Sequence, residues 1–134
     1  MPESLTFDSE PLLAFFLGET GGEIVSDCLA KIQRKEIDGF INVVNLAEVY
    51  YILFRLNPLQ ADETCRALCH LGLIILPVED DDLWRNAAKI KAQHSLSLAD
   101  AFAVATAEKQ KSTLVVGSDK EFDGLAVKFL KIRD

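Results

Sequence analysis

The pattern of apolar and polar residues predicts short strands separated by amphipathic helices. Strands are expected where β-branched and aromatic residues run together, at residues 5–7, 40–44, 73–78, 113–116 and 127–132. Helices are expected where apolar residues recur every three to four positions, at residues 11–17, 23–37, 45–56, 59–71, 80–92 and 95–110. This alternation favours an α/β fold, a three-layer α/β/α sandwich around a mostly parallel sheet.

Two of these segments carry further information. The strand at 73–78, LIILPV, is continuously apolar, which is typical of a strand covered on both faces. The helix at 95–110 is apolar on almost every side, which predicts that it is buried. Asp100 interrupts that apolar helix, although a buried carboxylate without a partner is costly.

Size and charge narrow the class of protein. The chain of 134 residues fits one domain, residues 1–134, with a sizeable core. Its net charge of −7 argues against nucleic-acid binding by a broad basic face, but leaves room for a local site where metal ions supply positive charge. No apolar run is long enough to span a bilayer and the first residues do not resemble a signal peptide, so a cytoplasmic location without a membrane partner is expected.

The cysteines offer one possible metal site. Cys28, Cys65 and Cys69 are expected to be reduced, because nothing in the sequence indicates export. Cys65, Cys69 and His70 are close in sequence, but no second ligand pair lies at zinc-like spacing. The pattern therefore favours a structural role for all three cysteines.

Four acids follow predicted strands or open predicted helices. They are Asp8 after the first strand, Glu48 after the second, Asp100 at the start of its helix and Asp119 after the fourth strand. In an open α/β sheet the carboxyl ends of parallel strands meet at one edge, where ligands bind. We therefore expect these acids to converge although they are distant in sequence.

Helix capping could explain each acid separately. Glu48 follows Asn45 at the spacing of a capping box, and Ser97 and Asp100 repeat a shorter form of it. The other two acids could cap helices or interact with the positive end of the helix dipole.

The four acids together favour a metal site. Caps normally lie at the solvent rim, whereas Asp100 stands among apolar neighbours. Carboxylates that share a site repel one another unless a cation lies among them. Hard oxygen ligands suit Mg²⁺ or Mn²⁺, so we interpret Asp100 as a metal-site residue on a buried helix.

Four segments of the chain, in order, resemble the motifs of PIN-domain ribonucleases. They are LTFDSEPLLAFFLGE, INVVNLAEVYYIL, LSLADAFAVATA and VVGSDKEF, and within that family they are similar to the VapC-type toxins of prokaryotic toxin–antitoxin pairs. The resemblance covers almost the whole chain. It implies an α/β/α sandwich with an acidic pocket for Mg²⁺ or Mn²⁺, and hydrolysis of RNA phosphodiester bonds that leaves a 5′-phosphate.

The resemblance also implies roles for individual residues. The four acids named above match the catalytic, metal-binding acids of the family, and Glu121 matches a supplementary metal ligand. We expect Asp8 and Asp100 to be direct ligands, and Glu48 and Asp119 to complete the coordination shell or orient water.

The chain departs from the family pattern near its fourth acid. Many members carry threonine or asparagine there, whereas this chain has Gly117 and Ser118. Asp123 could replace Glu121, although the spacing favours Glu121. Glu10, near the first acid, is expected to cap the helix that follows.

Partners and alternatives follow from the same resemblance. It implies an RNA substrate, a homodimer and an antitoxin partner. Apolar residues of the helical segments 23–37 and 50–56 could serve such contacts, although most are expected to be core. One alternative is a non-catalytic PIN-like interaction domain whose acids are caps. Another is a phosphoacceptor α/β domain, but the sequence Asp8-Ser9-Glu10 lacks the paired acids of a receiver domain and the Asp-x-Asp of aspartate-based phosphatases.

Overall fold

A parallel sheet lies at the centre of the computed structural model, which describes residues 3–118, 122 and 124–134. Within these residues the sheet has five strands in the order β3-β2-β1-β4-β5, and every neighbouring pair is parallel. The strands are β1 (Ser4–Phe7), β2 (Asp38–Asn42), β3 (Ile74–Leu76), β4 (Thr113–Val116) and β5 (Phe129–Lys131). The parallel sheet expected from the sequence is confirmed.

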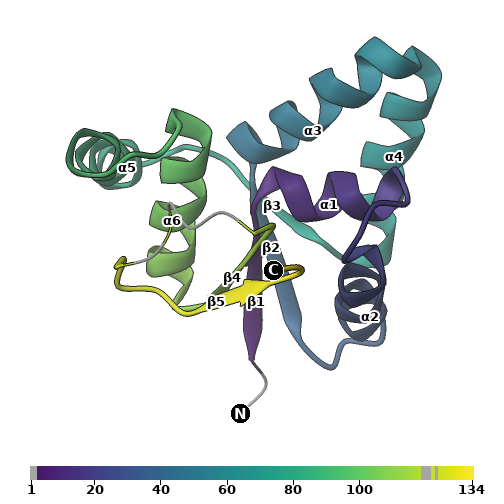
Figure 1. Cartoon of the computed structure of the whole chain (residues 1–134), viewed down its shortest axis with the longest axis horizontal. Coiled ribbons are helices and arrows are strands. Elements are labelled where there is room, and N and C mark those ends of the chain that lie inside the picture. Colours follow the sequence, from purple (N-terminus) through teal and green to yellow (C-terminus); the bar gives the residue numbers. More distant parts are fainter. Residues whose placement is uncertain (1–2, 119–121, 123) are drawn as a thin grey trace.

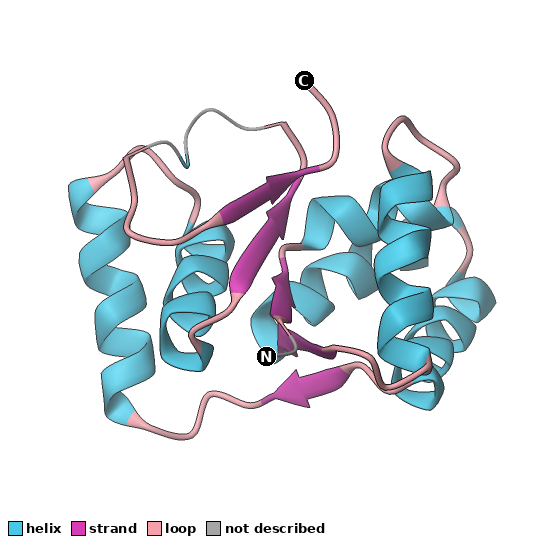
Figure 2. Cartoon of the chain, turned by 90° about the horizontal axis from the view of Figure 1, so that it is seen from below, coloured by secondary structure: helices cyan, strands magenta, loops and turns pink. Residues whose placement is uncertain are grey.

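Helices cover both faces of the sheet and complete the three-layer sandwich. They are α1 (Ser9–Phe16), α2 (Gly22–Gln33), α3 (Val43–Leu56), α4 (Pro58–Leu71), α5 (Asp81–Gln93) and α6 (Leu98–Gln110). Figures 1 and 2 show α5 and α6 on one side of the sheet and α1 to α4 on the other.

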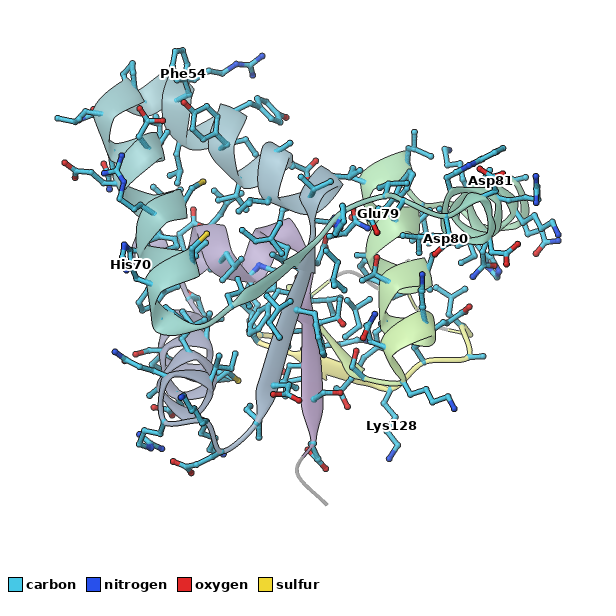
Figure 3. The ribbon with its side chains drawn as sticks, turned by 180° about the vertical axis from the view of Figure 1, so that it is seen from behind. Phe54, His70, Glu79, Asp80, Asp81 and Lys128 are labelled. Carbon is cyan, nitrogen blue, oxygen red and sulfur yellow. The ribbon has the colours of Figure 1, made fainter. Side chains whose placement is uncertain are left out.

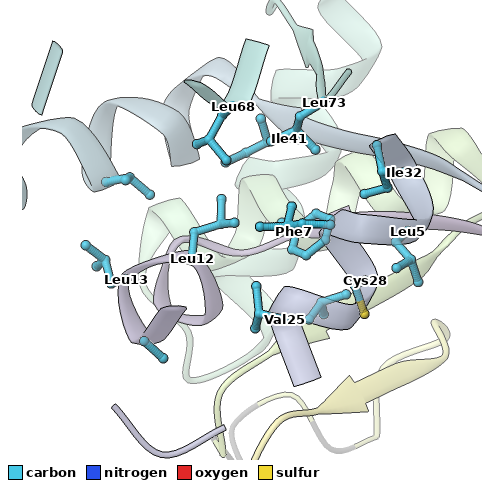
Figure 4. Packing of buried hydrophobic residues seen from close by; sticks show 14 of the residues in the cluster. Leu5, Phe7, Leu12, Leu13, Val25, Cys28, Ile32, Ile41, Leu68 and Leu73 are labelled. Atoms are coloured by element: carbon cyan, nitrogen blue, oxygen red, sulfur yellow. The ribbon is translucent and has the colours of Figure 1, made fainter. Parts of the chain in front are cut away.

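The alternation of side chains along the strands divides the core between these two layers. Leu5 and Phe7 of β1 pack with residues of the α1–α4 layer such as Leu12 and Leu68 (Figure 4). Leu114 and Val116 of β4 instead pack with residues of α5 and α6. Because β1 is the middle strand, the residue that follows it is placed deep in the molecule.

Helix α6 is the helix that the sequence predicts to be buried. Four of its five alanines are buried together with Val104 and Thr106; they are Ala101, Ala103, Ala105 and Ala107. The helix contacts β1, β2 and β4 as well as α3 and α5.

The start of α3 differs from the prediction. Val43 and Val44 were expected to end a strand, but they form the first turn of α3. Asn42 is the N-cap, and its Oδ1 accepts a hydrogen bond from the backbone N–H of Val44 at 2.9 Å. This side-chain cap overrides the strand preference of the two valines.

Two other expectations about elements are wrong. Strand β3 lies at the edge of the sheet and Ile74 is 43% exposed, so the apolar run there does not mark a strand covered on both faces. Helix α2 ends at Gln33, four residues before the predicted end, and Lys35 beyond it adopts a left-handed conformation with φ of 63°. In the part of the chain that the structure describes, no helix is long and apolar enough to cross a membrane.

Candidate active site

Asp8 lies between the last residue of β1, Phe7, and the first residue of α1, Ser9. Its backbone N–H donates to the carbonyl oxygen of Val115 in β4 at 3.0 Å, so the sheet itself fixes its position. Its side chain is buried, with 2% of the residue exposed. The residue stands at the N-cap position of α1, yet its carboxylate makes no capping hydrogen bond. Capping therefore does not explain this acid.

The surroundings of Asp8 disfavour its charged form. Burial is the largest cause and raises the pKa of the carboxyl group well above its ordinary value. The negative charge of Asp100 raises this pKa further, and those of Glu48 and Glu10 add to the effect, while the backbone N–H of Ser9 lowers it. Residues 8, 48 and 100 are thus close enough for their charges to interact across three elements.

Glu48 lies in the second turn of α3, because that helix begins at Val43. The capping box that was the alternative explanation for Glu48 is therefore wrong, since Asn45 lies inside the helix. Glu48 instead accepts a hydrogen bond from the hydroxyl group of Ser9, at the start of α1. This bond ties the glutamate to the residue next to Asp8.

Asp100 lies in the first turn of α6. Ser97 is the N-cap, and its Oγ accepts a hydrogen bond from the backbone N–H of Asp100 at 3.1 Å. The aspartate is half-buried rather than buried, whereas Ala101 beside it is fully buried. The helix that carries it is buried as expected, and Asp100 sits at its more open end.

Asn45 is a residue of this site that sequence reasoning assigned to a different role. It is fully buried, and its Nδ2 donates to the carbonyl oxygen of Ala99 at 2.9 Å and to Oδ1 of Asp8 at 3.4 Å. Its own Oδ1 has no hydrogen-bond partner among the described residues. An unsatisfied buried acceptor typically costs about 1–3 kcal/mol. The only sequence signal was its spacing of three residues from Glu48, which also fits a cap.

Glu10 is ion-paired instead of serving only as a cap. Its carboxylate forms a salt bridge with Arg133, which follows β5, and both side chains are partly buried. Arg133 also donates to the carbonyl oxygen of Thr20 at 3.4 Å. A Cβ placed on Gly117 would lie 2.4 Å from the Glu10 carboxyl carbon, so a larger residue where β4 ends would displace the Glu10 carboxylate.

The remaining predicted residues are only partly covered by the structure. Asp119, Glu121 and Asp123 lie outside the described residues. Ser118 is half-buried just after β4. Among residues 3–118, 122 and 124–134, no three His, Cys, Asp or Glu side chains are arranged so that they could hold a metal ion, and this includes the group around Cys65.

A separate groove lies between α5 and α6, with a volume of about 630 Å³. Asp80, labelled in Figure 3, lines it together with Asn86, Glu108 and Lys109. These polar side chains are paired with one another: Lys109 with Asp80, and Asn86 with Glu108 at 2.9 Å. None of the three interacting acids, Asp8, Glu48 and Asp100, lines this groove.

Comparison with protein families and solved structures agrees with this geometry. The family model of the PIN domain matches residues 5–128. No curated protein sequence matches the chain.

Solved structures of the same fold include several proteins from bacterial toxin–antitoxin systems. A toxin–antitoxin complex from Klebsiella pneumoniae aligns over 96% of this chain and 97% of its own, with 20% identity and a TM-score of 0.75. VapBC2 from Rickettsia felis, bound to a DNA fragment from its promoter, aligns over 96% and 98% with 13% identity and a TM-score of 0.73. VapC20 from Mycobacterium tuberculosis, described as a toxin that cleaves the sarcin–ricin loop, aligns over 95% and 98% with 17% identity and a TM-score of 0.70. At these identities the likeness establishes the fold.

Proposed function

This chain belongs to the PIN domain family, and from that premise we propose that it is a Mg²⁺- or Mn²⁺-dependent endoribonuclease, the toxin of a toxin–antitoxin pair. The observation that carries the proposal is the buried Asp8, which has no capping role and lies within the electrostatic influence of Asp100 and Glu48. A fold does not build such a site for stability, because each added carboxylate disfavours the charge of the others.

The described side chains fit a hard divalent cation in their chemistry. Asp8, Glu48 and Asp100 offer carboxylate oxygens, and Asn45 leaves a buried amide oxygen without a protein partner. Oxygen-only ligand sets suit Mg²⁺ and Mn²⁺. A cation among these groups would offset the repulsion that raises the pKa of Asp8.

In the proposed site the acids would divide the coordination of the cation. Asp8 and Asp100 would hold it directly, Glu48 and Asp119 would complete its shell or orient water, and Glu121 would be a supplementary ligand. When bound, the cation lowers the pKa of water and offsets negative charge on the phosphodiester. The Ser9 hydroxyl keeps the Glu48 carboxylate beside the start of α1 through its hydrogen bond.

The proposal includes an antitoxin partner, a homodimer and a cytoplasmic location. Several solved structures of this fold are complexes of a toxin with its antitoxin, which supports a protein partner. Exposed apolar side chains on α3 and α4 are candidates for such contacts; they are Tyr51, Phe54, Leu56 and Leu59. Phe54 lies near the end of α3 that is farthest from the sheet (Figure 3).

The function is tested by removing one acid without changing the shape of its side chain. We expect Asp100→Asn to fold as the wild type does but to cleave RNA at least about 100-fold more slowly, because it weakens cation binding. Wild-type cleavage should stop in excess EDTA and return with Mn²⁺. The assay is cleavage of a labelled RNA, with the cut ends analysed for a 5′-phosphate.

Asp82→Asn is the matched control for charge. Asp82 lies in α5 with a fully exposed side chain, so the variant loses one negative charge outside the site and should cleave normally. Normal cleavage by Asp100→Asn, or by the wild type in excess EDTA, contradicts the proposal. If calorimetry with Mn²⁺ also finds no specific site, the chain is the non-catalytic interaction domain.

A further inference from the structure

Asn45 is placed where the three acid-bearing elements of the site meet. It belongs to α3, one turn before Glu48 in the same helix. Its side chain is completely buried and reaches both the end of β1 and the start of α6.

One amide nitrogen makes both connections. Nδ2 donates to the carbonyl oxygen of Ala99, the residue before Asp100, at 2.9 Å. The same nitrogen donates to Oδ1 of Asp8 at 3.4 Å. An amide has two N–H groups and no charge, so it can bind a carbonyl and a carboxylate together without adding to the charge of the pocket.

We propose that Asn45 is a positioning residue that sets the placement of Asp8 relative to Asp100. The two carboxylates repel each other, so their spacing needs a fixed element between them. Asn45 supplies that element from the first turn of α3. As a consequence, the two carboxylates stay close enough together to bind one cation, although they repel each other. This consequence for cation binding rests on the proposed function.

The chain offers a matched control in Asn42. This second asparagine is also fully buried and lies three residues earlier. It donates to Oγ1 of Thr106 at 3.1 Å and caps α3, but no recorded bond joins it to an acid of the site. A purely structural asparagine should therefore behave like Asn42.

The first test measures, in the cation-free protein, whether Asn45 holds the start of α6 in place. We expect Asn45→Ala to speed amide hydrogen exchange at Asp100 and Ala101, whose N–H groups bond to Ser97 at the start of α6. Asn42→Ala should leave exchange at these two amides unchanged. Unchanged exchange in Asn45→Ala, or equal acceleration in both variants, overturns the proposal.

The second test reads the consequence for the cation and for catalysis. Asn45→Ala should weaken Mn²⁺ binding by about 10- to 100-fold in calorimetry and lower kcat similarly, with little change in KM. Asn45→Ser, which keeps one donor, should recover part of both losses, and it replaces the alanine variant if that variant does not fold. Asn42→Ala should lower the melting temperature while keeping Mn²⁺ affinity and kcat.

The two proposals fail in different ways. If the wild type neither binds Mn²⁺ nor cleaves RNA, the proposed function is wrong, and the exchange experiment still decides the role of Asn45. If the wild type is active and Asn45→Ala matches it in Mn²⁺ affinity and kcat, Asn45 has no positioning role.

Discussion

At Asp8, burial and neighbouring charge act in the same direction. Both raise the pKa of the carboxyl group, so in the absence of a cation the folded protein holds its proton to higher pH than the unfolded chain does. Between the ordinary pKa of aspartate and the raised value, the folded state binds more protons than the unfolded state. The contribution of the Asp8 carboxyl group to the free energy of unfolding is therefore fully present at low pH. It is lost as pH rises through the raised pKa.

Asp8→Asn tests this sign. The variant keeps an acceptor oxygen for Asn45 but carries no charge, so without metal it should melt several degrees above the wild type at neutral pH. The difference should shrink as pH falls to below the ordinary pKa of aspartate, where the wild-type carboxyl is protonated in both states. Melting curves across pH in EDTA measure the effect, with Asp82→Asn as the exposed control. A lower melting temperature for Asp8→Asn at neutral pH contradicts the argument.

The same residues show what sequence reveals about a site. The acids could be predicted as site residues from the sequence, because each follows a predicted strand or opens a predicted helix, and this is a local property of the sequence. The role of Asn45 could not be selected, because its partners lie 37 and 54 residues away in the chain. The pair of Glu10 and Arg133 spans 123 residues and was missed for the same reason.

At the scale of elements, α6 is defined by its short side chains. Its buried alanines have short side chains, which lets the helix pack close to the sheet. Because apolar residues lie on almost every side of the helix, the sequence predicted that it is buried. Strand β4 was predicted with its observed ends, because flanking polar residues bound the apolar run. The start of α3 was not, because the cap of Asn42 competes with the strand preference of Val43 and Val44.

Enlarging one alanine tests the packing of α6. Ala103 is fully buried, so Ala103→Leu should lower the free energy of unfolding by about 1–3 kcal/mol through overpacking. Leu98→Ala in the same helix is the control, because Leu98 is 53% exposed and its loss should change that free energy by less than about 0.5 kcal/mol. Urea unfolding monitored by circular dichroism gives both values. Equal stability of Ala103→Leu and the wild type would mean that the helix has room beside the sheet.

At the scale of the whole molecule, the segment after β5 is tied to the helix that follows Asp8. The salt bridge of Glu10 with Arg133 joins α1 to the segment after β5. Just before it, Ile132 donates its N–H to Val116 at 3.1 Å and to Gly117 at 3.2 Å, which fixes that segment on the end of β4. Strand order is the part of the fold that local pattern did not reveal: the apolar run of β3 suggested an inner strand, yet it forms an edge.

A double-mutant cycle tests the long-range ion pair. Arg133→Ala removes the guanidinium that offsets Glu10 near the other acids, so it should destabilise the protein, and Glu10→Gln should relieve part of that loss. We expect a coupling free energy of about 1 kcal/mol, reduced by added salt. The exposed pair of Arg34 and Glu36 is the control and should show little coupling. Additive effects of Arg133→Ala and Glu10→Gln would show that the bridge does not stabilise the fold.

The hydrogen bond from Asp8 to Val115 also determines when the acidic pocket can form during translation. Strand β1 is made first, but its partner β4 leaves the ribosome only after α6 has been synthesised. A nascent chain that stops within α6 already contains residues 8, 48 and 100. It still lacks β4, whose Val115 accepts the hydrogen bond that fixes the position of Asp8. For a protein proposed to cut RNA, the pocket is thus completed only after β4 has been synthesised.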